Sequence, residues 1–391
     1  MSEQYDFSDI APIDDCDFQS KMSQLVLEPG FEHAVRFVMP DVDYPEFADQ
    51  LRSVKDKSTF QRQVMFPFLK MLEAKTTDGI TCDGMETVDR DKAYTFLSNH
   101  RDIVLDASFL NLCLLTNDRN TSEVAIGSNL LIYDWITDLV KLNKSFIVKR
   151  NIQRTKALEA ARQLSAYIHN TISVKHESVW IAQREGRAKD SNDLTQESLM
   201  KMLALDGDGG FVDNLLDINV LPLSISYEYD PNDYLKAREF LLKRLDPGYK
   251  KSQHDDLLSM ETGLLKNKGR VHFHFCGCIN DALRSVDTSL PKVEIVKSVC
   301  HIIDRAIHAG YRIYPINYVA YDRLHGDGKR FASMYTDRQS RDIEDYIESQ
   351  LAKVDLPDVS RLDLDYMREM MYVMYANPLR NKLEADKQIP L

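Results

Sequence analysis

The sequence contains no long apolar run, and this absence limits how the chain can meet a membrane. No stretch of its 391 residues approaches the ~20 apolar residues of a membrane-spanning helix. The first residues, MSEQYDFSDIAPIDDCDF, also lack the basic start and the apolar core of a secretory signal. We therefore expect a cytoplasmic protein without a transmembrane helix.

Excess positive charge and paired cysteines are missing as well. The chain has 49 Lys and Arg against 61 Asp and Glu, a formal net charge of −12. Because general nucleic-acid-binding proteins carry a basic footprint, no nucleic-acid partner is expected. The six cysteines do not show the paired spacing of a disulfide framework, which favours a reducing compartment.

The pattern that is present predicts an α/β fold. From about residue 92, short β-rich runs alternate with helical patterns at about 105–116, 129–142 and 154–172. This alternation predicts a mainly parallel mixed sheet flanked by helices. The expected strands are Ala93–Ser98, Ser122–Ile126, Phe146–Val148, Val179–Ala182, Val220–Tyr227 and Val271–Phe275.

Helical extensions are expected on both sides of this unit. Residues 57–75 have apolar side chains at every fourth position from Phe60 to Leu72, with Pro67 expected to kink or break the helix. From about residue 292 the chain again has helical patterns. We therefore predict a helical N-terminal extension over 1–83, a catalytic domain over 84–291 and a helical C-terminal extension over 292–391.

Three polar clusters directly follow expected strands. In a parallel sheet the loops after the strands share one edge, where ligands bind. The clusters could therefore converge although they span almost ninety residues. They are Asn99 to Asp102, Lys149 with Arg150, and Arg184 to Arg187.

His100 is the natural general base among these residues. Its ordinary pKa of about 6.5 suits proton abstraction near neutral pH, and a nearby carboxylate would fix its tautomer. The structural alternative is a histidine at a helix start, with Asp102 as the N-cap. Arg150 and Arg187 suit an anionic substrate, because arginine grips phosphate through two parallel hydrogen bonds. Gly186 permits a tight turn.

Residues 141–162 form a basic segment in an otherwise acidic chain. They carry seven basic residues against the single acid Glu159, a balance of 7 − 1 = +6. This fits an anionic substrate, an anionic membrane surface or an acidic carrier. A solvated helix face is the structural alternative.

The segment Val271–Cys278 alternates two histidines with two cysteines, but we do not predict a metal site from it. On one strand these side chains share a face, yet the outer pair is about 20 Å apart. Zinc needs its ligands within about 2.0–2.3 Å of one point. A half-buried strand face is therefore the expected role.

In order and approximate spacing, the clusters resemble the four motifs of the glycerol-3-phosphate and lysophosphatidate acyltransferase family over about residues 84–228. The first motif, a histidine followed by an aspartate, is similar to His100 through Asp106. The other three are similar to Asn143–Arg150, Val179–Arg187 and Val220–Ile225. The resemblance implies that His100, paired with Asp106, is the catalytic base. It implies acceptor binding by Arg101, Arg150, Glu185, Gly186 and Arg187.

Two departures from the family pattern bear on the site. Five residues separate His100 from Asp106 where the family usually has four, so Asp102 is a second possible partner. Gln183-Arg184 stands where the family often has Phe-Pro. The extra residue also leaves open a catalytically silent lipid-binding protein. A further alternative is an acyltransferase with another acceptor, such as an amino-acid-derived lipid.

The resemblance also implies substrates and a location. An acyl thioester on coenzyme A or acyl carrier protein would donate to glycerol 3-phosphate or 1-acylglycerol 3-phosphate, with no cofactor and no metal. Such acceptors partition into membranes, so a peripheral position on the inner face of the cell membrane is expected. Residues 57–75, and Trp135 within 129–142, are candidate interfacial elements. Their structural alternative is to cover the sheet.

Overall fold

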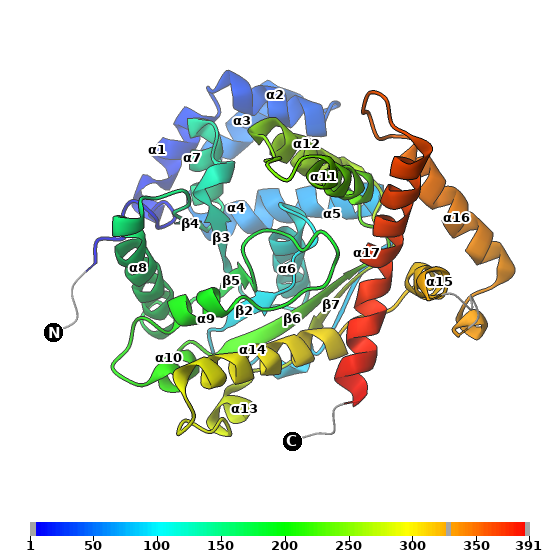
Figure 1. Ribbon diagram of the computed structural model, residues 1–391. Coiled ribbons are helices and arrows are strands. Elements are labelled where there is room, and N and C mark those ends of the chain that lie inside the picture. The colour runs from blue at the N-terminus through cyan, green and yellow to red at the C-terminus, as the bar shows by residue number, and fades with distance from the viewer. Residues whose placement is uncertain (1–4, 326–329, 388–391) are drawn as a thin grey trace.

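A mixed sheet with helices on both faces forms the centre of the molecule (Figure 1). The computed structural model describes residues 5–325 and 330–387. The α/β class, the mainly parallel sheet and the helical segments at both ends are confirmed. The division into domains at residues 83 and 291 stays a prediction.

Seven strands make up the sheet in the order β1-β7-β6-β2-β5-β3-β4. Neighbouring strands are parallel, except that β6 and β7 are antiparallel. The loops after β2, β4 and β5 therefore all leave the sheet at the carboxyl ends of their strands, on the same side of the sheet, as the sequence predicts. The strands are β1 (Ile80–Asp83), β2 (Thr95–Ser98), β3 (Glu123–Gly127), β4 (Ser145–Val148), β5 (Val179–Ala182), β6 (Val220–Tyr227) and β7 (Val271–Phe275).

Strand β1 was not expected from the sequence. It lies in the segment 1–83, for which only helices are predicted, and its four residues Ile-Thr-Cys-Asp are too few to show an apolar alternation. It joins the sheet by pairing in parallel with β7, so that Ile80 lies opposite Val271 and Asp83 lies opposite His274. The sheet therefore has seven strands where the sequence indicates six, and β1 forms one of its edges.

One face of the sheet is covered by five helices that share a single apolar core. Tyr167 and Ile303 of these helices pack in the same buried cluster as Leu97 and Val179 of the sheet. The helices are α8 (Arg154–Ser173), α9 (Glu197–Leu203), α10 (Phe211–Asp217), α13 (Asn280–Arg284) and α14 (Lys292–Ala309).

The opposite face is covered by α5 (Phe66–Thr76) and α6 (Leu105–Thr116), with α12 (Gln253–Leu265) packed against α5. Phe109 of α6 packs in one cluster with Leu223 and Phe273 of the strands. Alternate residues of a strand point to opposite faces. Ser224 accordingly faces α14, where its hydroxyl donates to the Ile307 carbonyl.

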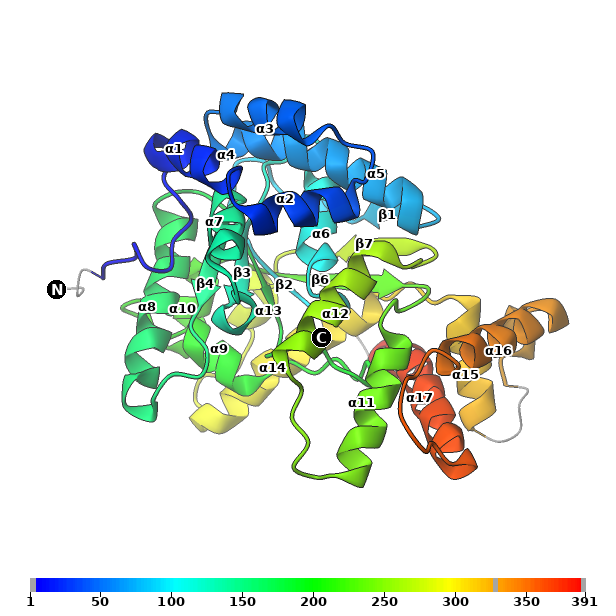
Figure 2. The ribbon, with the colours of Figure 1, turned by 90° about the horizontal axis from the view of Figure 1, so that it is seen from above.

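A group of N-terminal helices closes over the α5–α6 side (Figure 2). Their core contains Phe18, Leu51 and Phe60, together with Leu142 of α7 (Asp134–Leu142). Pro67 follows a short π-helical turn, which accommodates a residue that has no N–H to donate. The other helices of this N-terminal group are α1 (Asp15–Leu25), α2 (Pro29–Val38), α3 (Tyr44–Ser53), α4 (Lys57–Phe60) and the π-turn η1 (Gln61–Met65).

The last helices pack with α11 (Asp233–Leu245) around a smaller core of their own. At its centre, the buried carboxylate of Asp233 accepts hydrogen bonds from the hydroxyls of Tyr346 at 2.7 Å and Tyr375 at 2.8 Å. Burial raises the pKa of Asp233 to about 7, and the nearby Asp230 charge adds to the rise. The helices are α15 (Pro315–Leu324), α16 (Asp337–Leu351) and α17 (Arg361–Lys387).

The raised pKa of Asp233 predicts a pH-dependent contribution to stability. The folded protein keeps this proton up to about pH 7, whereas the unfolded chain releases it near pH ~3.9. Between these values the wild type therefore loses stability as pH rises, by up to ~1.4 kcal/mol per pH unit from this group.

The substitution Asp233→Asn removes this titration. The free energy of unfolding of the variant relative to wild type should therefore rise between about pH 4 and pH 7 and be constant above, as measured by urea denaturation. Asp386→Asn, an exposed change on α17, is the matched control. A relative stability of Asp233→Asn that is independent of pH would contradict the assignment.

Candidate active site

The loop after β2 is fixed to the neighbouring strand β6 by a side chain that imitates strand pairing. The Asn99 amide donates to the Ile225 carbonyl at 2.9 Å and accepts from the Ile225 N–H at 2.8 Å. The indole N–H of Trp180 on β5 donates to the Ser98 hydroxyl at 3.0 Å. These bonds set the point from which the His100 side chain leaves the sheet.

His100 is paired with Asp106. Its Nδ1 lies 2.7 Å from Asp106 Oδ2, and its ring packs edge-on against Trp180 with centroids 5.6 Å apart. The same carboxylate oxygen accepts the backbone N–H groups of Arg101 at 2.6 Å and Asp102 at 3.0 Å. Because a carboxylate is acceptor-only, Nδ1 must carry the proton, which leaves Nε2 as the free acceptor.

Asp102 has a different role, because it bonds the backbone N–H groups at the start of α6, whose N-cap residue is Val104. Asp102 Oδ1 accepts the N–H groups of Val104 at 2.9 Å and Leu105 at 2.8 Å. The loop therefore turns before the helix, and Asp106 in the first turn of α6 reaches back to His100. The extra residue between His100 and Asp106 is absorbed in this turn. The geometry favours Asp106 over Asp102 as the partner.

The Asp102 carboxylate is tightly enclosed. Burial raises the pKa of Asp102, and the charge of Asp106 adds to the rise. Its Oδ2 has no hydrogen-bond partner among the described residues. A Cβ atom built on Gly263 of α12 would lie only 1.9 Å from this oxygen. Glycine at position 263 is therefore required for α12 to pass so close to the loop that carries His100.

His100 opens onto a cavity of about 1880 Å³. This volume exceeds the ~300–1,000 Å³ of ordinary small-molecule pockets. Residues from all three polar clusters line it: His100, Arg150, Glu185, Gly186 and Arg187. The structure thus brings these five predicted site residues to one space.

Basic side chains gather at the end of the cavity near the β5 loop. Arg187 is 7% exposed, and its Nη1 has no hydrogen-bond partner among the described residues. Gly186 before it adopts a left-handed backbone conformation with φ +68°. Arg150 reaches this end from β4 and pairs with Glu185 at 3.1 Å. A buried guanidinium with an unused donor is a ready binding group for an anion.

Lys189 adds to the positive charge at the same end. Burial lowers its pKa to about 8, and the neighbouring charge of Arg187 contributes to the decrease. Lys189 also pairs with Glu239 at 3.1 Å. A bound anion near Arg187 would oppose this lowering, because it would stabilise the protonated amine.

The structure does not bring Arg101 to the cavity. Its side chain is 5% exposed, donates a hydrogen bond to Asp193 Oδ1 at 3.3 Å and forms an ion pair with Asp193 Oδ2 at 2.7 Å. It also lies over the ring of Tyr311. Its neighbour His100 points the other way, so we leave Arg101 out of the proposed site and regard it as a support for the loop.

The other end of the cavity is apolar and lies among the N-terminal helices. Val64 and Phe68, whose four-residue spacing predicts a helix face, line it together with Phe31. Trp135 also lines it and packs against Phe31, with ring centroids 6.3 Å apart. The sequence did not reveal that the 57–75 helix contributes to the site, because its periodicity is equally typical of a helix that covers a sheet.

The rim of the cavity carries exposed apolar side chains. Phe37 on α2 is 50% exposed and Tyr133 before α7 is 55% exposed, and both line the cavity. Over residues 5–325 and 330–387, no helix combines the length and apolarity that crossing a bilayer requires.

No protein-family model matches the sequence, and no curated protein matches it. One solved structure that resembles this chain is the 1-acyl-sn-glycerophosphate (LPA) acyltransferase PlsC from Thermotoga maritima, with a TM-score of 0.35 and 14% identity. The match covers 74% of this chain and 95% of that chain. Likeness at this level carries no functional weight, so we base the proposal below on the residues themselves.

The contact between Gly263 and Asp102 predicts an unusual response to alanine. In a helix interior, Gly→Ala is ordinarily favourable by about 1 kcal/mol. Here Gly263→Ala should instead destabilise the protein by roughly 1–3 kcal/mol, because the added methyl displaces the buried Asp102 carboxylate. Glu261→Ala, on an exposed position of the same helix, is the control. Denaturant unfolding of both variants checks this, and a stabilised Gly263→Ala protein would show that the contact is loose.

Proposed function

We propose that this protein is an acyltransferase that moves a fatty acyl group from a thioester to a hydroxyl of glycerol 3-phosphate or 1-acylglycerol 3-phosphate. The observation that carries the proposal is the pairing of His100 with Asp106 at the wall of a cavity with one apolar and one basic end. The ordered resemblance of the sequence motifs to the glycerolipid acyltransferases supports the same reaction.

The histidine would act as a general base. Nε2 of His100 takes the proton of the acceptor hydroxyl while that oxygen attacks the thioester carbonyl carbon. Asp106 holds the ring in the required tautomer and stabilises the imidazolium that forms. The tetrahedral intermediate then collapses, the carbon–sulfur bond breaks, and the proton passes from Nε2 to the leaving thiolate. The products are an ester and a free thiol.

The two ends of the cavity suit the two parts of the substrates. Arg187 and Arg150 would bind the acceptor phosphate, Glu185 would accept a hydrogen bond from its hydroxyl, and Gly186 would allow close approach. The apolar end around Phe68 would take the acyl chain. The donor would be acyl-coenzyme A or an acylated carrier protein, and neither a cofactor nor a metal takes part in this step.

A peripheral position on the inner face of the cell membrane fits this chemistry. The exposed rings of Phe37 and Tyr133 at the cavity rim provide an apolar surface through which a lipid acceptor could enter. The basic segment 141–162 would favour an anionic lipid surface near the same opening.

The dyad geometry favours an active enzyme over a silent lipid-binding homologue, since the extra residue does not separate His100 from Asp106. The direct test is incubation of purified protein with acyl thioester and each candidate acceptor. Transfer to glycerol 3-phosphate or 1-acylglycerol 3-phosphate is expected. Transfer only to an amino-acid-derived lipid would show that this lipid, and not a glycerol phosphate, is the acceptor. If no acceptor led to consumption of the thioester, the proposal that the protein is an acyltransferase would be refuted.

His100→Ala should lower the rate of acyl transfer by ~10²- to 10⁴-fold, because it removes the general base. Asp106→Asn should also lower the rate of acyl transfer, because the His100 ring then loses the acceptor that orients it. His254→Ala, at an exposed position of α12 outside the cavity, is the matched control. Thermal melting verifies that the variants fold. A folded His100→Ala protein with near-normal turnover would disprove the mechanism.

Arg187→Ala should raise the acceptor KM by roughly 10- to 100-fold with a smaller effect on kcat, because a charged hydrogen bond to phosphate is worth about 1.5–3 kcal/mol. Arg187→Lys keeps the charge without the forked donor and should fall between wild type and alanine. Arg338→Ala, an exposed change on α16 outside the cavity and the basic segment, is the control. An unchanged acceptor KM in Arg187→Ala would show that the phosphate binds elsewhere.

A further inference from the structure

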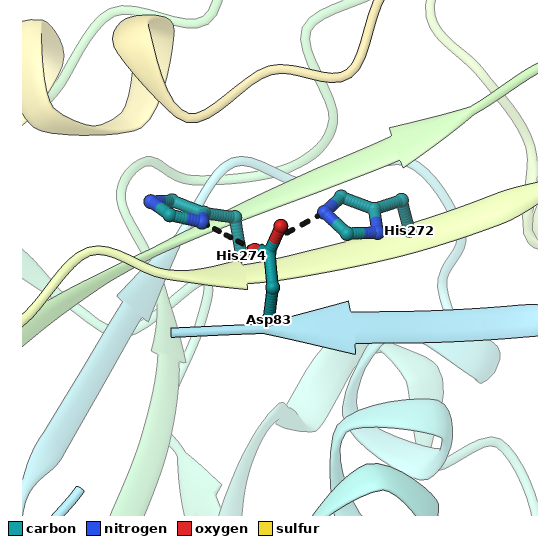
Figure 3. Close-up of side chains that lie close together, drawn as sticks. All are labelled: Asp83, His272 and His274. Atoms are coloured by element: carbon teal, nitrogen blue, oxygen red, sulfur yellow. Dashed lines mark hydrogen bonds and ion pairs between the residues drawn. The ribbon is translucent and has the colours of Figure 1, made fainter. Parts of the chain in front are cut away.

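Two histidines and an aspartate meet at the β1–β7 edge of the sheet (Figure 3). His272 and His274 are two residues apart on β7 and therefore point to the same face. Parallel pairing places Asp83 of β1 opposite His274. The carboxylate lies between the two rings, and one ligand atom from each residue lies within 4.8 Å of the others.

The cluster is separate from the acyl-transfer cavity. None of its three residues lines that cavity. The histidines belong to the sheet face that is covered by α14, whereas the intervening Phe273 points into the α6 core. The loop after α14 closes over the cluster, because a Cβ on Gly310 would lie 2.6 Å from the His274 ring.

The ring of His272 is oriented by a neighbouring hydroxyl. Its Nδ1 lies 2.8 Å from Thr81 Oγ1, and that hydroxyl donates its own proton to the Val271 carbonyl at 3.3 Å. With that hydroxyl as the donor to Val271, Thr81 can accept from Nδ1–H, and the Nε2 lone pair of His272 is then available to an ion held beside Asp83. An outer-shell acceptor that fixes the tautomer in this way is typical of histidines that ligate metals.

The spacing of the three atoms suits a metal ion. His272 Nε2 lies 3.3 Å from Asp83 Oδ1, which is about the separation of two ligands in a tetrahedral site with bonds of ~2.0–2.1 Å. His274 Nδ1 lies 2.5 Å from the same oxygen in a direct hydrogen bond. That bond would have to open by less than about 1 Å. Asp83 is 50% exposed and His274 is 35% exposed, so both side chains can move.

We propose that Asp83, His272 and His274 bind a divalent transition-metal ion, with zinc as the best match. Two imidazole nitrogens and one carboxylate oxygen form a ligand set that zinc accepts, and water would complete the coordination. The ion would join β1 to β7 and so stabilise the edge of the sheet. One of the three ligands comes from a second strand, β1, and therefore lies outside the segment Val271–Cys278.

Arg312 is the group that competes with the ion. Its guanidinium lies 3.5 Å from the second carboxylate oxygen of Asp83, and its side chain is 51% exposed. A bound cation would repel it, and the exposed side chain is free to swing toward solvent. Binding should therefore become tighter when this charge is removed, which a purely structural ion pair with Asp83 would not produce.

The test is titration of the full-length, tag-free, chelator-treated protein with Zn²⁺ by calorimetry. Wild type should bind one equivalent saturably and should melt at a higher temperature with zinc. Asp83→Asn and His274→Ala should each weaken binding by more than the ~10- to 100-fold typical of outer-shell changes. His254→Ala, at an exposed position on α12, is the control and should bind as wild type does.

Two further variants separate a built site from incidental binding by surface histidines. Arg312→Gln should increase the affinity, whereas Thr81→Val should reduce it by roughly 10- to 100-fold, because the His272 ring loses its orienting acceptor. The proposal is overturned if wild type shows no saturable binding at one equivalent. It is equally overturned if Asp83→Asn and His274→Ala bind zinc as tightly as His254→Ala does.

Discussion

A single buried carboxylate oxygen organises the candidate site. Oδ2 of Asp106 accepts from the ring of His100 and from two consecutive backbone N–H groups of the loop before α6. The first turn of a helix is a favourable place for this negative charge, because the helix dipole points its positive end there. The loop, the start of the helix and the ring of His100 therefore depend on the same atom. The Asn99 bonds to β6 then fix this unit to the sheet.

The sheet brings the residues that we propose for substrate binding to this unit. Because β2, β4 and β5 run in the same direction, Arg150 and Arg187 lie at the edge where His100 leaves β2. The N-terminal helices add an apolar wall that the sheet alone could not provide. A base, an anion-binding end and an apolar end in one cavity are what acyl transfer to a phosphorylated lipid precursor requires. The His100–Asp106 pair alone would fit many reactions that need a general base, and the two ends of the cavity narrow the choice to acyl transfer onto an anionic acceptor.

The sequence predicted the parts of this site that local patterns encode. Apolar runs located β5 and β6, and an alternation of apolar residues with histidines located β7, all within the bounds observed. The expected parallel direction of the strands then implied that the polar loops converge. It could not reveal that Arg101 would turn toward Asp193, because that contact joins residues 92 positions apart. It also missed β1, whose four residues carry no pattern, and with it the position of Asp83 beside the β7 histidines. Contacts between distant segments decide such features.

The central claim is that His100 faces the reacting hydroxyl inside this cavity. A crystal structure of the protein with an acceptor and a non-reactive acyl-thioester analogue tests it most directly. The account predicts an acceptor hydroxyl about 2.6–3.2 Å from His100 Nε2, the phosphate against Arg187, and the acyl chain in the apolar end beside Phe68. An acyl chain bound outside the cavity, or a hydroxyl beyond reach of Nε2, would contradict it.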